Sequence, residues 1–426
     1  MAATYPYYTE PTHDQGTVAS VAGNAARTTA TSAAEGRLIV DAVDKIMLLE
    51  PNKHPLVSLL TNVGKVYDGK AWKGSGMLKA PTGNPEFSWF EDFYGGRYCA
   101  VNAGGGYAAS GAITITVDGA GTNSAYIFTV GDIVKNAETG ENMLVDTVAS
   151  GTTITIAAGG RAFGTTVAAA GTDDDGLFLV GNVSEENAGA RNVNTTRSSK
   201  ETNYTQIFKT SITVSGTERE ANLYGGPDLT YLRAKMGTQH ALDIERMFWW
   251  GEKKLDTSGT MGHPRRATGG ILEWIAASGA YTQDAGGTLT ETELNTFLRE
   301  GFTYGSDSKV MFVGGLVLQV INQFAQTKIE MRPIEKSYGM QIGKWVTAFG
   351  EVNLIHNPLF VEAYAGVGFL LDMDCFKYRY MNNRDTKLFT NVQSPDVDGQ
   401  IDQYVTEVGL QRMQAPKCAY LYGVTG

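Results

Sequence analysis

The sequence predicts an α+β protein that carries a small inserted all-β domain. Short β-branched runs separated by Gly, Asp and Asn turns fill residues 107–187, with no helical period. One long apolar stripe at helical spacing follows at 227–250. Strands and helices then mix to the end of the chain, and together these three observations indicate the class.

The composition indicates a large folded protein without a nucleic-acid-binding face. The chain has 426 residues, 42% of them hydrophobic, enough for two or three domains of ~150 residues. Its 35 basic and 45 acidic residues give a formal charge of −10, which argues against a high-affinity nucleic-acid binder. Only 19% of residues are charged, against roughly 25% in globular domains. This suits either a surface that meets other protein or a β-rich domain with many glycine turns.

The first part of the chain reads as an arm, two helices and a second arm. Residues 1–36 are rich in Ala, Thr and Ser without an apolar period, so we expect them to be disordered or to fold against a partner. Apolar spacing from Arg37 predicts a helix that Pro51 ends, and Pro55 starts the next helix. Glycine and lysine dominate residues 63–79, which predicts a mobile hairpin arm.

Two strands should frame the β module. Residues 84–93 place Phe87 and Trp89 on one side of a strand, and residues 203–214 alternate in the same way. We expect these strands to pair antiparallel, with the module projecting from between them. Its five strands are expected in a barrel or sandwich, at 112–117, 125–130, 142–148, 152–157 and 177–182.

The long helix should run from Pro227 to Trp250, about 36 Å at ~1.5 Å per residue. A polar Gly/Pro loop is expected at 252–270. The elements expected after it are helices at 290–303 and 316–326 and strands at 309–315, 345–356, 368–373, 376–381, 404–413 and 418–424.

No group of residues indicates catalysis, a cofactor or a metal. The five histidines never fall at metal-ligand spacing, and His240 on the apolar stripe is expected to be a core or interface histidine. Asp173-Asp174-Asp175 lacks the spacing of a calcium loop and predicts a solvated turn. The three cysteines predict buried thiols, and no apolar run approaches the ~20 residues that span a bilayer.

Several motifs, taken in order, resemble the major capsid proteins of tailed bacteriophages with the Hong Kong 97-type fold. They include KIMLLEPNKHPLVSLL (45–60), NPEFSWFED (84–92), PDLTYLRAKMGTQHALDIERMFWWG (227–251) and FGEVNLIHNPLF (349–360). The chain is most similar to the head proteins whose extended loop carries an inserted β domain. The resemblance implies an N-terminal arm at 1–36, N-terminal helices at 37–64, an extended loop at 65–106 and 186–215, an inserted all-β domain at 107–185, a peripheral domain at 216–254 and 371–426 with a spine helix at 227–250, and an axial domain at 255–370.

The same resemblance implies a structural protein and not an enzyme. Copies would self-assemble into hexamers and pentamers of an icosahedral head that encloses double-stranded DNA. The implied partners are neighbouring copies of the chain, with scaffold, portal and decoration proteins, and packaged DNA only through weak non-specific contact. No cofactor, metal or membrane is implied. The expected place is the virion, after assembly in the host bacterial cytoplasm.

The extended loop supplies candidates for contacts between subunits, because an extended arm cannot bury its faces within its own chain. The candidates are Trp72, Lys73, Trp89, Phe90, Glu91, Asp92, Tyr94, Arg191 and Arg197. An S-layer or surface adhesion protein with a β-rich module is the alternative interpretation.

Overall fold

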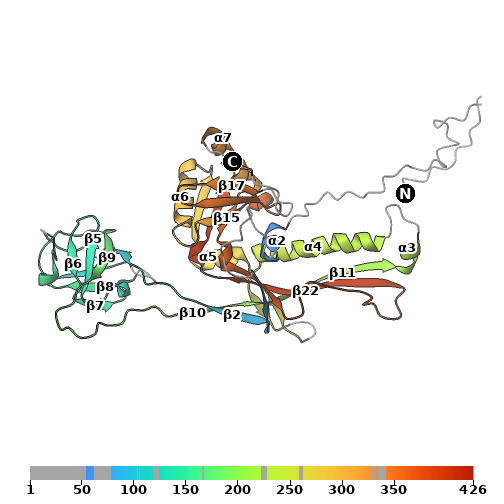
Figure 1. The fold of residues 1–426 in the computed structure, drawn as a ribbon, viewed down its shortest axis with the longest axis horizontal. Coiled ribbons are helices and arrows are strands. Elements are labelled where there is room, and N and C mark those ends of the chain that lie inside the picture. The colour runs from blue at the N-terminus through green and yellow to red at the C-terminus, as the bar shows by residue number, and fades with distance from the viewer. Residues whose placement is uncertain are drawn as a thin grey trace, which may run out of the picture. The chain divides into compact units, whose positions relative to one another are not determined.

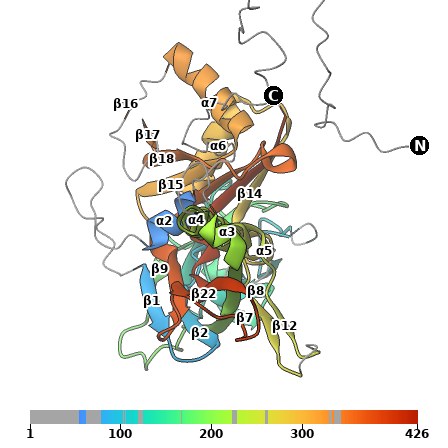
Figure 2. The same ribbon diagram turned by 90° about the vertical axis from the view of Figure 1, so that its right-hand side faces the viewer.

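The computed structural model describes residues 54–61, 78–102, 104, 106–118, 124–165, 167–221, 228–258, 262–328, 332–333 and 342–425. It is an α+β protein, with few helices and many strands, which confirms the predicted class (Figures 1 and 2). The predicted arm at 1–36, the helix expected from Arg37 and most of the arm at 63–79 lie outside the described residues. None of the described helices is long and apolar enough to cross a membrane.

The largest sheet has seven strands in the order β14-β23-β19-β15-β18-β17-β16. Their bounds are Tyr281–Gly287 (β14), Ser308–Val313 (β15), Arg332–Pro333 (β16), Ile342–Val346 (β17), Glu351–His356 (β18), Gly368–Leu371 (β19) and Ala419–Val424 (β23). The central strand β15 pairs in parallel with β18 and antiparallel with β19. All its residues after Ser308 are buried, as expected for a strand covered on both faces.

Two helices bury apolar side chains against this sheet. They are α6 (Glu291–Gly301) and α7 (Gly315–Lys328), and they confirm the helices predicted at 290–303 and 316–326. Helix α6 begins at Thr290, whose side chain accepts a hydrogen bond from the Glu293 amide, while the Glu293 carboxylate accepts one from the Thr290 amide. This capping box explains why the sequence signal for the helix was clear.

A second sheet has the order β1-β20-β22-β11, with β21 paired to β22. Its strands are Lys79–Thr82 (β1), Phe376–Met381 (β20), Lys387–Phe389 (β21), Gly399–Arg412 (β22) and Gln206–Ser215 (β11). The long helix α4 (Asp228–Trp250) confirms the helix predicted at 227–250. Its Phe248 and Trp249 are fully buried in a core that also contains Phe376, Tyr378 and Leu410 of the sheet.

Two compact units divide the chain. Among the described residues, the smaller consists of residues 210–221, 228–240 and 388–404, and the larger contains the rest. The elements β11, α4 and β22 each run from one unit into the other. These limits differ from those of the predicted domains, and the division into arm, extended loop, peripheral and axial domains stays a prediction.

Polar contacts hold the smaller unit together. Arg233 on α4 forms an ion pair with the buried Asp402 on β22 at 2.6 Å. The Tyr404 hydroxyl donates to the Arg233 carbonyl at 3.1 Å. His240 is 2% exposed and its Nδ1 lies 2.8 Å from the Thr210 hydroxyl, so the prediction of a core histidine is confirmed. The short helix α3 (Gly216–Glu220) begins at Ser215, which caps it.

The β-rich region forms two sheets around one apolar core. One has the order β3-β9-β5-β6 and the other β4-β8-β7. The strands are Tyr98–Ala100 (β3), Ile113–Thr116 (β4), Asp132–Asn136 (β5), Asn142–Leu144 (β6), Thr147–Ser150 (β7), Thr153–Ile156 (β8) and Gly176–Asn182 (β9). Because β3 pairs with β9, this fold begins before residue 107, where the sequence placed its start.

One local prediction in this region was wrong, and another holds only in part. Residues 125–130 form a 3-10 helix (Ala125–Ile127) and not a strand, and the strand follows at β5. The Asp132 carboxylate accepts the Thr129 amide at 2.7 Å, which closes a turn there. The turn at 173–175 is only partly solvated, because Asp175 is 6% exposed and accepts hydrogen bonds from Asn136 and Thr172.

The segment predicted as a polar loop at 252–270 contains an antiparallel hairpin, β12 (Lys254–Asp256) with β13 (Arg265–Ala267). A helix that the sequence did not predict, α5 (Ile271–Ala277), follows it. Its buried residues Ile271, Trp274 and Ile275 have helical spacing, but seven residues are too few to stand out as a period.

The short helix α2 (Pro55–Thr61) lies beside α4 (Figures 1 and 2), and a buried carboxylate joins the two helices. Glu245 on α4 accepts hydrogen bonds from the amides of Leu56 at 3.0 Å and Val57 at 2.9 Å, and from the Trp249 indole at 3.3 Å. Burial raises the pKa of Glu245 to about 7, although these hydrogen bonds favour the charged form. Two amides that lack a partner within their own helix are thereby satisfied.

Glu245 should make stability depend on pH. Its pKa is about 7 in the folded chain against an ordinary value of 4.5. Between these values the folded chain holds a proton that the unfolded chain has released, so the free energy of unfolding should fall as pH rises, by up to about 1 kcal/mol per pH unit. Urea titrations at about pH 5, 6 and 7 measure this slope. Glu245→Gln should flatten it, and an equal slope in that variant would contradict the assignment.

Candidate assembly surface

A two-stranded ribbon connects the β-rich region to the body of the larger unit. It consists of β2 (Glu86–Glu91) and β10 (Ser199–Tyr204), which pair antiparallel from Glu91 with Ser199 to Glu86 with Tyr204. An antiparallel partner for β2 is confirmed, but it is residues 199–204, so only Asn203 and Tyr204 of the predicted strand 203–214 pair with it. After Thr205 the chain continues as β11, which joins the five-stranded sheet.

The two faces of the ribbon differ. Phe87, Trp89 and Glu91 are buried, and Glu86, Ser88 and Phe90 alternate with them on the exposed face. The Trp89 indole donates to the Glu91 carboxylate at 2.7 Å, so the buried polar atoms of this face are paired. Phe90 is 70% exposed at the end of the other face.

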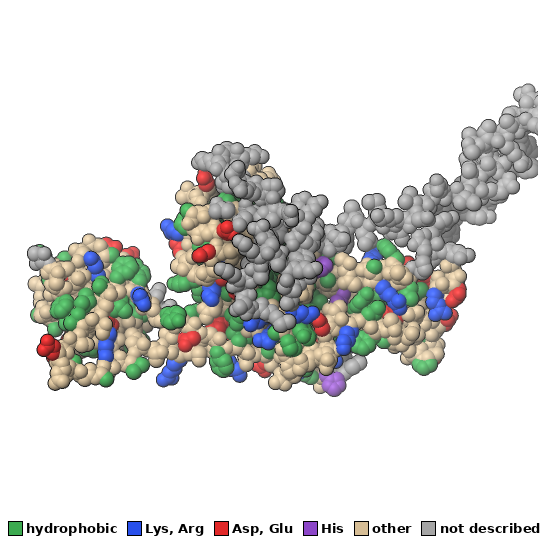
Figure 3. Space-filling model, viewed as in Figure 1, with side chains coloured by type: hydrophobic (Ala, Val, Ile, Leu, Met, Phe, Trp, Pro, Cys, Tyr) green, Lys and Arg blue, Asp and Glu red, His purple; other side chains and the backbone are tan. Residues whose placement is uncertain are grey.

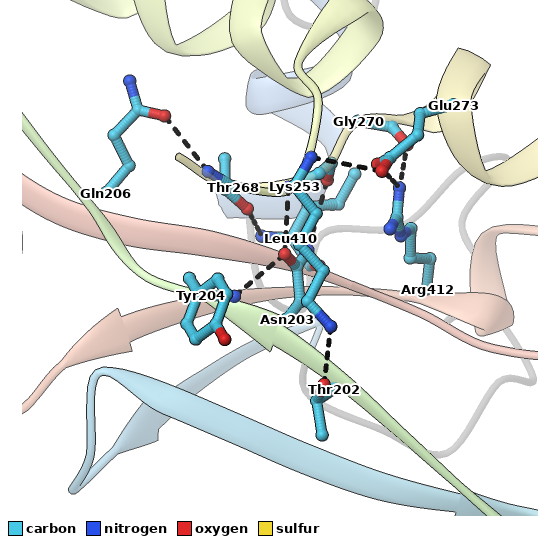
Figure 4. Close-up of polar contacts among 11 residues, drawn as sticks. Thr202, Asn203, Tyr204, Gln206, Lys253, Thr268, Gly270, Glu273, Leu410 and Arg412 are labelled. Atoms are coloured by element: carbon cyan, nitrogen blue, oxygen red, sulfur yellow. Dashed lines mark hydrogen bonds and ion pairs between the residues drawn. The ribbon is translucent and has the colours of Figure 1, made fainter. Parts of the chain in front are cut away.

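One asparagine fixes the base of the ribbon (Figure 4). The fully buried Asn203 donates from its amide nitrogen to the carbonyls of Leu410 at 2.7 Å and Gly269 at 3.2 Å. Its amide oxygen accepts from the backbone amides of Gly269 and Tyr204, both at 2.9 Å. The side chain thus uses its full hydrogen-bonding capacity to join β10, β22 and the segment before α5.

Further contacts surround this base (Figure 4). The Thr268 amide donates to Gln206 at 3.2 Å, and its hydroxyl accepts from the Leu410 amide at 3.2 Å. Arg412 forms an ion pair with Glu273 at 3.0 Å. Burial lowers the pKa of Arg412, and Glu273 opposes that shift.

Glycine at position 409 allows the ribbon to lie against β22. A Cβ atom there would fall 2.4 Å from the Tyr204 carbonyl oxygen and 2.7 Å from the Phe87 ring. Both distances are shorter than any real contact of such an atom, so a side chain would push the ribbon away. The base of the ribbon is therefore held by close packing as well as by hydrogen bonds.

Beyond the ribbon, residues 92–97 and 183–198 form no helix or strand and are almost entirely exposed. Tyr94 is 100% exposed and Val193 87% exposed. The two segments are joined by the Thr196 hydroxyl, which lies 2.7 Å from the Asp92 carboxylate and 2.5 Å from the Phe93 carbonyl. Hydrophobic side chains are also exposed on the visible face of the β-rich region (Figure 3).

The predicted contact residues fall into three groups. Trp72 and Lys73 lie outside the described residues. Trp89 and Glu91 are buried within the chain at 8% and 9% exposure, so their inclusion was wrong: strand alternation turns them to the face opposite Phe90. The remaining candidates are exposed, although Arg191 forms an ion pair with Asp132; they are Phe90, Asp92, Tyr94, Arg191 and Arg197. Two residues of this surface were not predicted: Val193, an isolated apolar residue without periodicity, and Asn203, whose partners are distant in the chain.

The described residues hold no cluster that suggests chemistry. No three His, Cys, Asp or Glu side chains among them gather as metal ligands would. Cys99, Cys375 and Cys418 are free and buried, as predicted. The features that stand out are the firmly held ribbon and the exposed apolar side chains at and beyond its far end.

The family model described as SU10 major capsid protein matches residues 20–425, nearly the whole chain. The chain belongs to the SU10 major capsid protein family. No curated protein matches it. The prediction of a tailed-phage major capsid protein is thereby confirmed, and nothing found supports the S-layer alternative. Membership of this family makes the chain a structural protein of the virion whose copies assemble into capsomers.

Solved capsid structures resemble this SU10-family chain at low identity. The capsid of cyanophage A-1(L) has 9% identity and a TM-score of 0.49, with 91% of this chain and 98% of that chain covered. The capsid of the native GTA particle has 10% identity and a TM-score of 0.40, with 57% and 81% covered. The SrpI encapsulin of Synechococcus elongatus PCC 7942 has 10% identity and a TM-score of 0.38, with 55% and 77% covered.

Proposed function

We propose that the β2–β10 ribbon and the exposed segments beyond it form a strap between subunits, in hexamers and pentamers of an icosahedral head around double-stranded DNA. One observation carries the proposal: a ribbon with a tightly bonded base presents large apolar side chains that none of the described residues covers. Phe90, Tyr94 and Val193 are 70%, 100% and 87% exposed. Apolar side chains gathered in this way mark interaction sites.

The ribbon has only two strands and is held firmly at one end. A two-stranded hairpin in water is marginally stable by itself, and here Asn203 and the close approach at Gly409 stabilise one end only. The far end gains stability when a neighbouring copy covers it. Aromatic residues are the side chains that most often anchor protein interfaces, and Phe90 and Tyr94 would act as such anchors.

The other partners follow from the family and from charge. Scaffold, portal and decoration proteins are the partners we propose besides the neighbouring copies, with assembly in the host cytoplasm. A formal charge of −10 per copy limits the attraction between shell and packaged DNA to weak non-specific contact. As part of this proposal the arm at 1–36 and the peripheral and axial domains keep the limits given above, whereas the inserted domain begins at β3 and not at residue 107.

Removing the two aromatic anchors should block assembly without unfolding the chain. In Phe90→Ser/Tyr94→Ser we expect at least about tenfold fewer closed shells by negative-stain microscopy and sedimentation, because the apolar surface for the neighbour is lost. The circular dichroism spectrum and melting temperature of the unassembled chain should stay unchanged.

Tyr126→Ser supplies the matched control, because Tyr126 is 64% exposed but lies outside the strap. It should assemble as the unmodified chain does. Shells in normal yield from the double variant would contradict the strap, and planar sheets from the unmodified chain would contradict a closed head.

A further inference from the structure

A groove lies between the exposed face of the β2–β10 ribbon and the β12–β13 hairpin. Its volume is about 660 Å³, within the range of pockets that hold small ligands. Ser88, Lys200 and Tyr204 line it from the ribbon, and Leu255 and Arg266 line it from the hairpin. Leu255 is 45% exposed, so the groove combines cationic groups with an uncovered apolar wall.

The charges of the groove favour an anionic guest. Lys200 and Arg266 form no ion pair with any residue that the structure describes. Glu86 is the one carboxylate among the lining residues, and a further cation lies close by: the Lys253 ammonium sits 5.4 Å above the Tyr204 ring. Cations with low-dielectric walls beside them raise the local concentration of negative groups.

A matching acidic segment lies on the same strap. Residues 184–190 are exposed throughout, and a turn closed by the Ala188 amide and the Glu185 carbonyl at 3.2 Å forms their centre. Asn187 takes a positive φ of 62° in this turn. The carboxylates of Glu185 and Glu186 have no ion-pair partner in the described part of the chain.

We propose that the groove receives the acidic turn around Glu185 and Glu186 of a second copy, whose carboxylates pair with Lys200 and Arg266. Every copy carries both the groove and the turn, so one contact made head to tail repeats around a ring. In an assembly of identical copies, each groove therefore has one acidic turn available to it. Ion pairs at an exposed rim fix orientation and register more than affinity, and a strap laid on a neighbour needs a fixed register. The inference rests on the strap proposed above and names its docking place.

Cysteine cross-linking tests the contact directly. Two chains, Glu186→Cys and Arg266→Cys, are co-assembled and mildly oxidised; the native thiols are buried and give little background. We expect a dimer at twice 45.8 kDa on denaturing gels from the mixture and not from either chain alone. Absence of the dimer from shells that assemble normally would overturn the inference and leave the strap intact.

A second pair checks the identity of the guest. Asp396 lies on another exposed acidic loop, so Asp396→Cys with Arg266→Cys serves as the matched control. A dimer from this pair instead of the first would overturn the proposed occupant. If Glu186→Cys/Arg266→Cys in one chain, diluted with unmodified protein, gives only an internal link, the contact is intramolecular and the inference also fails.

Charge reversal provides a readout independent of cysteine. Lys200→Glu/Arg266→Glu should lower the yield of shells about tenfold, and adding Glu185→Lys/Glu186→Lys to the same chain should restore it to within about twofold. Restoration requires that these four groups meet. If the variant with all four substitutions gives no more shells than Lys200→Glu/Arg266→Glu, the proposed pairing is overturned. If Phe90→Ser/Tyr94→Ser does not affect assembly, the strap itself is overturned.

Discussion

Lys309→Met is expected to lower the free energy of unfolding of the unassembled chain by about 3 kcal/mol or more. Lys309 on β15 is fully buried, and its ammonium donates to the carbonyls of Gly301 at 2.5 Å, Lys417 at 2.6 Å and Tyr304 at 2.7 Å. Methionine fills similar space but leaves three buried acceptors without a donor, and each costs about 1–3 kcal/mol before the structure relaxes. Urea unfolding measures the loss.

The pKa of Lys309 supports the same account. Burial lowers it, so the ammonium is kept in the core at a cost that the three carbonyls offset. Lys235→Met is the control, because Lys235 is exposed on α4 and should change stability by less than about 0.5 kcal/mol. Equal stability of the two variants would show that the carbonyls find other donors.

Arg161→Met should destabilise the β-rich region by about 3–5 kcal/mol, because it leaves a buried carboxylate unpaired. Arg161 binds both oxygens of the fully buried Glu141, at 2.8 and 3.0 Å, and donates to the carbonyls of Ala108 and Ala169. Hydrogen exchange of the strands β4 to β9 reports the loss locally.

The effect should depend on pH. Burial by itself raises the pKa of Glu141, but the hydrogen bonds of Arg161 and of the Ala169 and Ala162 amides outweigh it, and the pKa lies below its ordinary value. Without Arg161 the pKa of Glu141 in the folded chain rises. The stability that the variant loses relative to the unmodified chain should therefore shrink as pH falls and Glu141 takes up a proton. Arg219→Met, which removes an exposed pair with Glu220, should cost less than about 1 kcal/mol. A deficit that does not change with pH would contradict this explanation.

Elements with a strong local pattern could be predicted from the sequence. The apolar stripe of α4 repeats over 23 residues, and α6 carries its capping box in adjacent residues. Residues 125–130 are apolar and β-branched, as is typical of a strand. They nevertheless contain a 3-10 helix, and the Asp132 carboxylate closes the turn that follows it. Helix α5 is too short for its spacing to be distinguished from a loop.

The assembly surface could be predicted only where its residues carry a local sequence pattern. Exposure of Phe90 and Tyr94 follows from an extended, apolar segment, and strict alternation along the strand would have assigned Trp89 and Glu91 to the buried face. The polar groups that hold the ribbon left no local signal. Asn203 binds Leu410, which is 207 residues away in the chain, and Lys309 is held by three carbonyls from two separate segments.

The elements β11, α4 and β22 cross from one compact unit to the other without a loop at the boundary. Each of these three elements therefore contributes residues to both units, and α4 passes from one unit to the other at His240. The helix has its weakest residue close to this point: Gly237, three positions before His240, beside the Tyr404 ring. Glycine is the poorest helix former after proline. A substitution that weakens one of these elements is therefore expected to lower the stability of both units together.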